Sequence, residues 1–214
     1  GEHYSILEGG KYVQEFEYST GELSNVILDL SQQKDSPIQN FTAYEFSPDE
    51  TKLLLTTGRE NIYRHSYVAS YYIADLKTNK INPLSTEGKQ QLATFSPDGS
   101  KIAFVRNNNL YFKDLSSDIE TAITEDGEFN EIINGSPDWV YEEEFGFNKA
   151  FAWSPDGKKI AFYRFDESQV KEFNMTMYEE LYPEWYRFKY PKAGEENSVV
   201  SINIYDFYAK NTIK

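Results

Sequence analysis

The residues best suited to chemistry form one acidic and aromatic run, Asp138-Trp139-Val140-Tyr141-Glu142-Glu143-Glu144. Carboxylates beside aromatic side chains suit a primary ammonium, because an ammonium has three donors and each carboxylate accepts through two oxygens. Successive residues of a helix point about 100° apart, so a short helical turn can aim two of these carboxylates at one volume. The run therefore indicates either an ammonium site or an exposed acidic turn without a ligand.

The sequence contains no pattern of residues typical of a catalytic nucleophile or of a metal site. The chain has no cysteine, which excludes thiolate nucleophiles, thiolate metal sites and disulfides. It also lacks a Gly-x-Ser-x-Gly nucleophile elbow, and His65, one of two histidines, is expected to be structural rather than a base. We therefore expect no catalytic residue, no metal site and no cofactor in this chain.

Composition narrows the classes of partner. The formal net charge is −14 and no Lys/Arg cluster is present, so we expect no nucleic-acid binding. The acidic surplus indicates a solvated surface and can draw cationic ligands into a cleft. No apolar run approaches the roughly 20 residues of a membrane span.

A recurring phrase indicates the elements that must position the acidic run. FSPDETKLLLTT begins at Phe46, FSPDGSKIAFVR at Phe95 and WSPDGKKIAFYR at Trp153. Each reads as an aromatic residue, a tight turn favoured by Pro, Asp and Gly, and a short apolar strand. Units of roughly 50 residues with about four strands match the size of a propeller blade.

The repeats predict an all-β chain, a partial β-propeller of about four blades, with a β-sandwich as the alternative. Two stretches depart from the repeat, 120–147 and 170–197. In repeat proteins such insertions form surface loops and often carry function. The acidic run lies in the first of them.

Three segments resemble the propeller of the dipeptidyl peptidase IV family of serine exopeptidases, a resemblance that spans about residues 41–206. They are DWVYEEEFGFNKAFAWSPDGKKIAFYRFD (138–166), IYRHSYVASYYIADL (62–76) and YPKAGEENSVVSINIYD (190–206). The resemblance implies an eight-bladed propeller that caps an α/β-hydrolase domain carrying Ser, His and Asp. On that basis we expect residues 1–214 to be one propeller fragment without the hydrolase domain, which would be inactive alone.

The resemblance also implies roles for the acidic run. Glu143 and Glu144 would hold the free amino terminus of a peptide, so that cleavage follows a second residue that is Pro or Ala. Trp139 and Tyr141 would support the turn by packing, and Glu142 has no such role in the family.

A further family contact has no evident counterpart in the sequence. In mammalian relatives an Arg from an earlier blade contacts the substrate carbonyl, and we expect its counterpart within Leu84–Gln91, a stretch that contains no Arg. Lys89 would replace it only in part, since an ammonium lacks the planar fork of Arg, so the contact is assigned to no residue of this stretch. Arg64 is interpreted as structural.

The second insertion resembles the propeller arm of the family, which takes part in homodimer contacts. Tyr182, Trp185, Tyr186 and Phe188 would be its aromatic anchors. The alternative is a loop folded over its own blade. We expect an exported bacterial protein, periplasmic or associated with the cell surface.

Two other functions remain open from the sequence. The first is a stand-alone propeller that binds partners without catalysis. The second is a prolyl tripeptidyl peptidase of the same family, in which the cleavage register is shifted by one residue.

Overall fold

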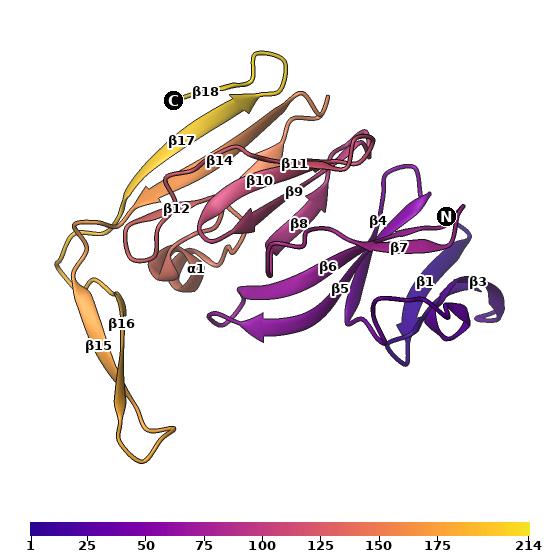
Figure 1. Cartoon of the computed structure of the whole chain (residues 1–214), viewed down its shortest axis with the longest axis horizontal. Helices are drawn as coiled ribbons and strands as arrows, with labels where there is room; N and C mark the ends of the chain where they lie inside the picture. The colour runs from indigo at the N-terminus through magenta and orange to yellow at the C-terminus, as the bar shows by residue number, and fades with distance from the viewer. The chain divides into compact units, whose positions relative to one another are not determined.

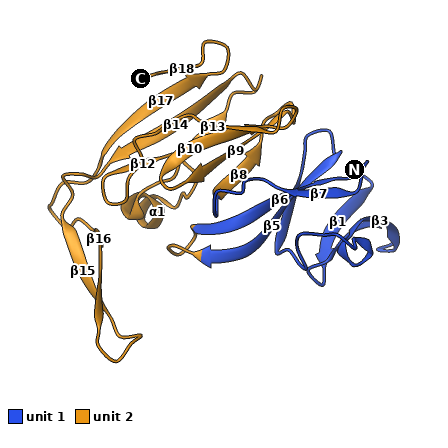
Figure 2. Cartoon of the chain, viewed as in Figure 1, with its two compact units in different colours: residues 1–60, 67–90 blue, residues 61–66, 91–214 orange.

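The computed structural model describes all residues, Gly1–Lys214, and the regular elements of the chain are almost all antiparallel strands. It divides into two compact units (Figure 2). Unit 1 comprises residues 1–60 and 67–90, and unit 2 comprises residues 61–66 and 91–214. The prediction of an all-β chain is confirmed. No helix is long and apolar enough to cross a bilayer.

Unit 1 consists of two sheets in which neighbouring strands follow one another along the chain. The first sheet contains β1 (His3–Glu8), β2 (Tyr12–Glu17) and β3 (Leu23–Asp29), followed by a short 3₁₀ helix (Leu30–Gln32). The second sheet contains β4 (Ala43–Phe46), β5 (Lys52–Asn61), β6 (Tyr67–Asp75) and β7 (Lys80–Pro83).

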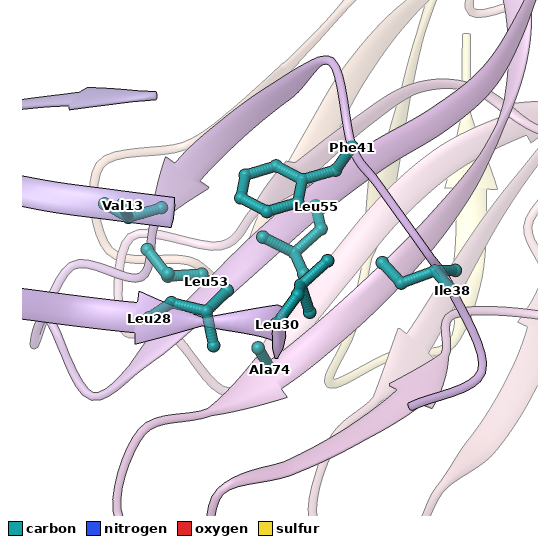
Figure 3. Packing of buried hydrophobic residues seen from close by; sticks show 8 residues of the cluster. All are labelled: Val13, Leu28, Leu30, Ile38, Phe41, Leu53, Leu55 and Ala74. Atoms are coloured by element: carbon teal, nitrogen blue, oxygen red, sulfur yellow. The ribbon is translucent and has the colours of Figure 1, made fainter. Parts of the chain in front are cut away.

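The core of unit 1 joins these two sheets (Figure 3). Val13 and Leu28 from the first sheet share a cluster with Leu53, Leu55 and Ala74 from the second. Burial of each large aliphatic side chain stabilises the fold by about 1.5–3 kcal/mol, before the ordering entropy is counted. The cluster also takes in residues from the connection between the sheets: Leu30, Ile38 and Phe41.

Unit 2 contains a four-stranded sheet of β8 (Gln91–Phe95), β9 (Lys101–Arg106), β10 (Asn109–Asp114) and β11 (Ile119–Ala122), again in chain order. Its second sheet has the order β12-β14-β17-β18, with β13 also paired to β14. These strands are β12 (Ile132–Asn134), β13 (Phe151–Trp153), β14 (Lys159–Asp166), β17 (Val199–Asp206) and β18 (Asn211–Ile213).

Residues 120–122 of the first departure belong to β11, and the main parts of both departures connect strands of this second sheet. Helix α1 (Trp139–Phe145) connects β12 to β13, and the hairpin of β15 (Glu172–Met177) and β16 (Glu184–Lys189) connects β14 to β17. Figure 1 shows the hairpin extending away from the sheet. A core cluster joins the four-stranded and five-stranded sheets of unit 2: Ala103, Val105, Leu110, Phe151, Ile160, Phe162 and Tyr205.

The repeated phrase forms the same turn at three hairpins, β4–β5, β8–β9 and β13–β14. At each, a Ser hydroxyl donates to the Asp two residues on, at 2.7, 2.6 and 2.7 Å, and accepts from the backbone N–H of the Lys five residues on. The residue after Asp has a positive φ, which Gly99 and Gly157 adopt without strain and Glu50 must tolerate. The turn chemistry predicted from Ser-Pro-Asp-Gly is therefore confirmed.

The turn carboxylates make stability depend on pH. Burial raises the pKa of Asp98, but hydrogen bonds from Ser96 and Ser100 outweigh it and hold this pKa below its ordinary value of 3.8. A depressed folded-state pKa gives stability that is present above the ordinary pKa and lost as the pH falls below it. Asp98→Asn should therefore lower the free energy of unfolding by about 1 kcal/mol at pH 7.

The difference between the parent protein and Asp98→Asn should shrink as the pH falls from 5 to 2, as measured by denaturant unfolding. Asp35→Asn, an exposed position without such a turn, is the matched control. A difference that stayed constant down to pH 2 would contradict the role assigned to the carboxylate.

Candidate functional site

Helix α1 carries the acidic run and is defined by a cap at each end. Asp138 begins it, its carboxylate accepting from the Tyr141 N–H at 2.9 Å and from the Ser198 hydroxyl. Gly146 ends it in the left-handed conformation and donates its N–H to the Glu142 carbonyl at 3.1 Å. Seven residues are too few for a stable isolated helix, so caps and packing must hold α1 in place.

The two aromatic residues of the run supply that packing. The ring of Trp139 lies against Tyr190, with centroids 4.6 Å apart, and Tyr141 packs edge-on against the buried Phe165 at 5.0 Å. Phe147 also contacts Tyr141. These contacts fit a supporting role for both rings.

Glu142 points into the protein and is only 1% exposed. Its Oε1 accepts two backbone hydrogen bonds, from the N–H of His65 at 2.7 Å and from that of Ser66 at 2.9 Å. These donors belong to the turn Ile62–Ser66 between β5 and β6, called the hairpin tip below. The sequence assigned no role to Glu142, because nothing in three successive glutamates tells which one faces inward.

The hairpin tip is held by further hydrogen bonds. Ile62 donates its N–H to the Ser66 carbonyl at 2.9 Å, and Tyr63 donates its N–H to the Ser66 hydroxyl at 3.2 Å. The side-chain amide of Asn148 donates to the His65 carbonyl at 3.2 Å. His65 thus contributes its backbone to these contacts.

Arg64 lies beside Glu143, and this contact was missed in the sequence. The Arg64 Nε is 3.1 Å from one carboxylate oxygen of Glu143 and 3.2 Å from the other. Glu143 is largely buried, with a side chain 18% exposed, whereas the Arg64 side chain is 71% exposed. The interpretation of Arg64 as structural did not foresee this ion pair with Glu143.

Lys89, considered above only as a partial replacement for the family's Arg, has partners of its own. Within unit 1 the ammonium of Lys89 lies 2.6 Å from a Glu60 oxygen and donates to the Gly58 carbonyl at 2.6 Å. The ammonium of Lys89 is therefore bound by two residues of β5. Arg64 could be recognised only by its contact with Glu143, since the two residues lie 79 positions apart.

Glu144 follows on α1, is exposed and forms no ion pair within the chain. Glu143 and Glu144 both lie in the last turn of the helix, where the macrodipole and the unsatisfied carbonyls favour a cation. The arrangement offers one carboxylate fixed by a guanidinium and one without a partner. It can bind a group that carries several N–H donors and a positive charge.

A cavity of about 190 Å³ lies beside the start of α1, with Tyr63, Ser66, Pro137, Glu167 and Lys189 in its wall. Burial, and then the neighbouring Asp138, raise the pKa of Glu167 to about 7. Burial likewise raises the pKa of Tyr63. Lys189 donates to the carbonyls of Ser168 and Val170, so its ammonium is directed to the base of the β15–β16 hairpin.

The β15–β16 hairpin is a two-stranded arm with an aromatic surface. Tyr182, Trp185 and Tyr186 are exposed, but Phe188 is buried and contacts Phe173. Phe188 therefore belongs to the packing at the base of the arm and is not an exposed interface anchor, as the sequence had suggested. Its place next to the sheet explains the difference, because the arm needs an apolar base there.

Residues 47–214 match the family described as Dipeptidyl peptidase IV (DPP IV) N-terminal region. The chain belongs to the dipeptidyl peptidase IV family. A probable dipeptidyl-aminopeptidase B of Emericella nidulans is 44% identical over 176 residues, which cover 75% of this chain and 19% of that protein. A dipeptidyl-aminopeptidase B of Aspergillus niger matches to the same extent.

Solved structures of the dipeptidyl peptidase IV family agree with this assignment. The crystal structure of Porphyromonas gingivalis dipeptidyl peptidase 4 superposes with a TM-score of 0.95 at 43% identity, covering 100% of this chain and 31% of that one. A putative dipeptidyl aminopeptidase IV from Bacteroides ovatus shares the fold, with a TM-score of 0.67 at 22% identity. The chain spans about a fifth of the length of the curated relatives it matches.

The raised pKa of Glu167 predicts a second pH dependence. Because this pKa of about 7 lies above the ordinary 4.5, ionisation of Glu167 costs stability as the pH rises through about 7. Asp138 and Glu131 oppose the charge and Lys189 favours it. Glu167→Gln, which cannot ionise, should therefore be more stable than the parent protein at pH 8 and lose that advantage at pH 4.

Thermal unfolding at both pH values checks this, with the exposed Glu172→Gln on β15 as the matched control. An advantage of Glu167→Gln that was equal at pH 4 and pH 8 would contradict burial of an ionising carboxyl.

Proposed function

We propose that this chain is the substrate-gating part of a dipeptidyl peptidase IV-like serine exopeptidase, the part that recognises the peptide amino terminus. The enzyme would release Xaa-Pro and Xaa-Ala dipeptides. The observation that carries the proposal is the pair of carboxylates in the last turn of α1, with Arg64 fixed against Glu143.

The site fits a peptide ammonium in both charge and donor count. Glu144 has no partner in the chain, and Glu143 has further acceptor capacity beside its bond to Arg64. An ammonium bridging the two carboxylates would form charge-assisted hydrogen bonds, among the stronger polar contacts. Holding the amino terminus at one point fixes the register and thereby selects the bond after the second residue.

Arg64 is assigned the contact with the substrate carbonyl that an Arg makes in mammalian relatives. Its guanidinium has five donors, and the bond from Nε to Glu143 leaves others free. The side chain is largely exposed, so a bound peptide can reach it. One guanidinium would then fix a carboxylate of the clamp and orient the first peptide group.

The sheets are proposed to be blades of a propeller. The β4–β7 and β8–β11 sheets are four-stranded meanders, and each would be one blade. The sheet of β12, β13, β14, β17 and β18 would be a third blade, which carries two insertions. Together with β1–β3 they would make about four blades of an eight-bladed ring, with residues 1–214 as one propeller fragment. Catalytic Ser, His and Asp would then lie in an α/β-hydrolase domain, and this fragment alone would be inactive.

The two alternative functions, a stand-alone binding module and a tripeptidyl peptidase, can be distinguished from the exopeptidase by simple measurements. A stand-alone binding module predicts a natural reading frame without a hydrolase domain, whereas the exopeptidase predicts one with Gly-x-Ser-x-Gly. A tripeptidyl peptidase predicts release of tripeptides from the same substrates. We also propose that the full-length protein forms a homodimer through Tyr182, Trp185 and Tyr186 of the arm, which are exposed. The protein is further proposed to be exported to the periplasm or the cell surface.

The clamp is tested by Glu143→Ala and Glu144→Ala in the full-length peptidase. Each removes charge-assisted hydrogen bonds worth about 1.5–3 kcal/mol, so kcat/KM for an Xaa-Pro substrate should fall about 10- to 100-fold. Glu125→Ala, an exposed glutamate of the same insertion, is the matched control and should leave kcat/KM unchanged. Near-parental activity in both clamp variants would refute the amine site.

The assignment of Arg64 is tested separately. Arg64→Ala should lower kcat/KM about tenfold, and Arg64→Lys should recover only part of it, since an ammonium lacks the planar fork. Arg187→Ala on the exposed face of the arm is the control. If Arg64→Ala matched the parent enzyme, the carbonyl contact would have to come from another residue.

A further inference from the structure

We propose that Glu142 is a positioning residue that holds the hairpin tip against α1 and thereby places Arg64 beside Glu143. The inference rests on the proposed function, because it gives Glu142 a part in building the amine site. It adds the first glutamate of the run, which is not expected to contact the substrate.

The geometry of Glu142 is that of an anchor for backbone. One carboxylate oxygen accepts from two consecutive N–H groups, at 2.7 and 2.9 Å, and the side chain is only 1% exposed. The donors are His65 and Ser66, the two residues that directly follow Arg64. Fixing these N–H groups therefore fixes the backbone from which the guanidinium extends.

The magnitudes indicate that the anchor, rather than the ion pair, places Arg64. An ion pair with an exposed partner contributes little, because water and salt screen it, and the Arg64 side chain is 71% exposed. A hydrogen bond to a charged group contributes more than one between neutral groups, and the two bonds to Glu142 are shielded from water. Two such bonds to Glu142 outweigh one contact between Arg64 and Glu143.

The second oxygen of Glu142 supports a positional role. Its Oε2 is buried and has no hydrogen-bond partner, which costs stability. Because burying this oxygen costs stability, the buried carboxylate is not explained by stabilisation of the fold alone. The burial is explained if α1 must both present Glu143 and Glu144 and hold the backbone next to Arg64. The guanidinium and the two carboxylates then keep fixed positions relative to one another.

A double-mutant cycle in the full-length peptidase tests the coupling. Glu142→Ala and Arg64→Ala should each lower kcat/KM for an Xaa-Pro substrate about tenfold, and the double variant should also lose about tenfold rather than about 100-fold. Glu142→Gln keeps an oxygen that can accept both N–H groups and should restore most of the activity. Glu125→Ala again serves as the control.

The outcomes separate this inference from the proposed function. No effect of Arg64→Ala would refute the role of Arg64 in the proposed function. Losses that multiply to about 100-fold in the double variant would overturn the positioning role, because Glu142 would then act independently of Arg64.

If Glu142→Ala does not fold, as judged by its thermal unfolding, Glu142→Asp takes its place in the cycle. The shorter side chain keeps the charge but withdraws the acceptor from the hairpin tip, so the same non-additivity is expected. Independent losses with Glu142→Asp would equally overturn the proposal.

Discussion

The site depends on one buried carboxylate that binds the backbone of a distant turn. Glu142 accepts from backbone N–H groups 77 and 76 positions earlier in the chain and thereby joins α1 to the two residues that follow Arg64. Because its partners are main-chain N–H groups, the bonds to Glu142 themselves use no side chain of His65 or Ser66, although the Ser66 hydroxyl helps to shape the tip. The interaction requires only that the hairpin tip have the right shape, which the tip's own hydrogen bonds provide.

Around this contact, three successive glutamates have three different environments. Helix geometry turns each by about 100° from the last, so Glu142 faces the protein, Glu143 lies at the margin with Arg64, and Glu144 faces solvent. A single turn of helix thus supplies an anchor, a paired carboxylate and a free carboxylate. The capping by Asp138 and Gly146 fixes where that turn begins and ends.

The repeated turns fix the strands between which the short helix α1 is connected. Each Ser-Pro-Asp-Gly turn is closed by the same side-chain hydrogen bonds and sets the register of the strands that follow it. The two insertions connect strands of one sheet in unit 2, so β12, β13 and β14 give α1 a rigid base. The chain thus combines the regular scaffold of a dipeptidyl peptidase IV N-terminal region with two irregular connecting segments.

The sequence by itself determined the local features: the all-β class, the three turns, the two insertions and the acidic run as the segment most suited to a cation. These follow from residue types at fixed short spacing, where sterics and hydrogen bonding act within a few residues. Only the tertiary structure decided which glutamate is buried, that Arg64 rather than Lys89 is the cation beside Glu143, and that Phe188 packs at the base of the arm. The physical reason is that these outcomes depend on contacts between segments far apart in the chain, and such contacts leave no periodic trace in the sequence.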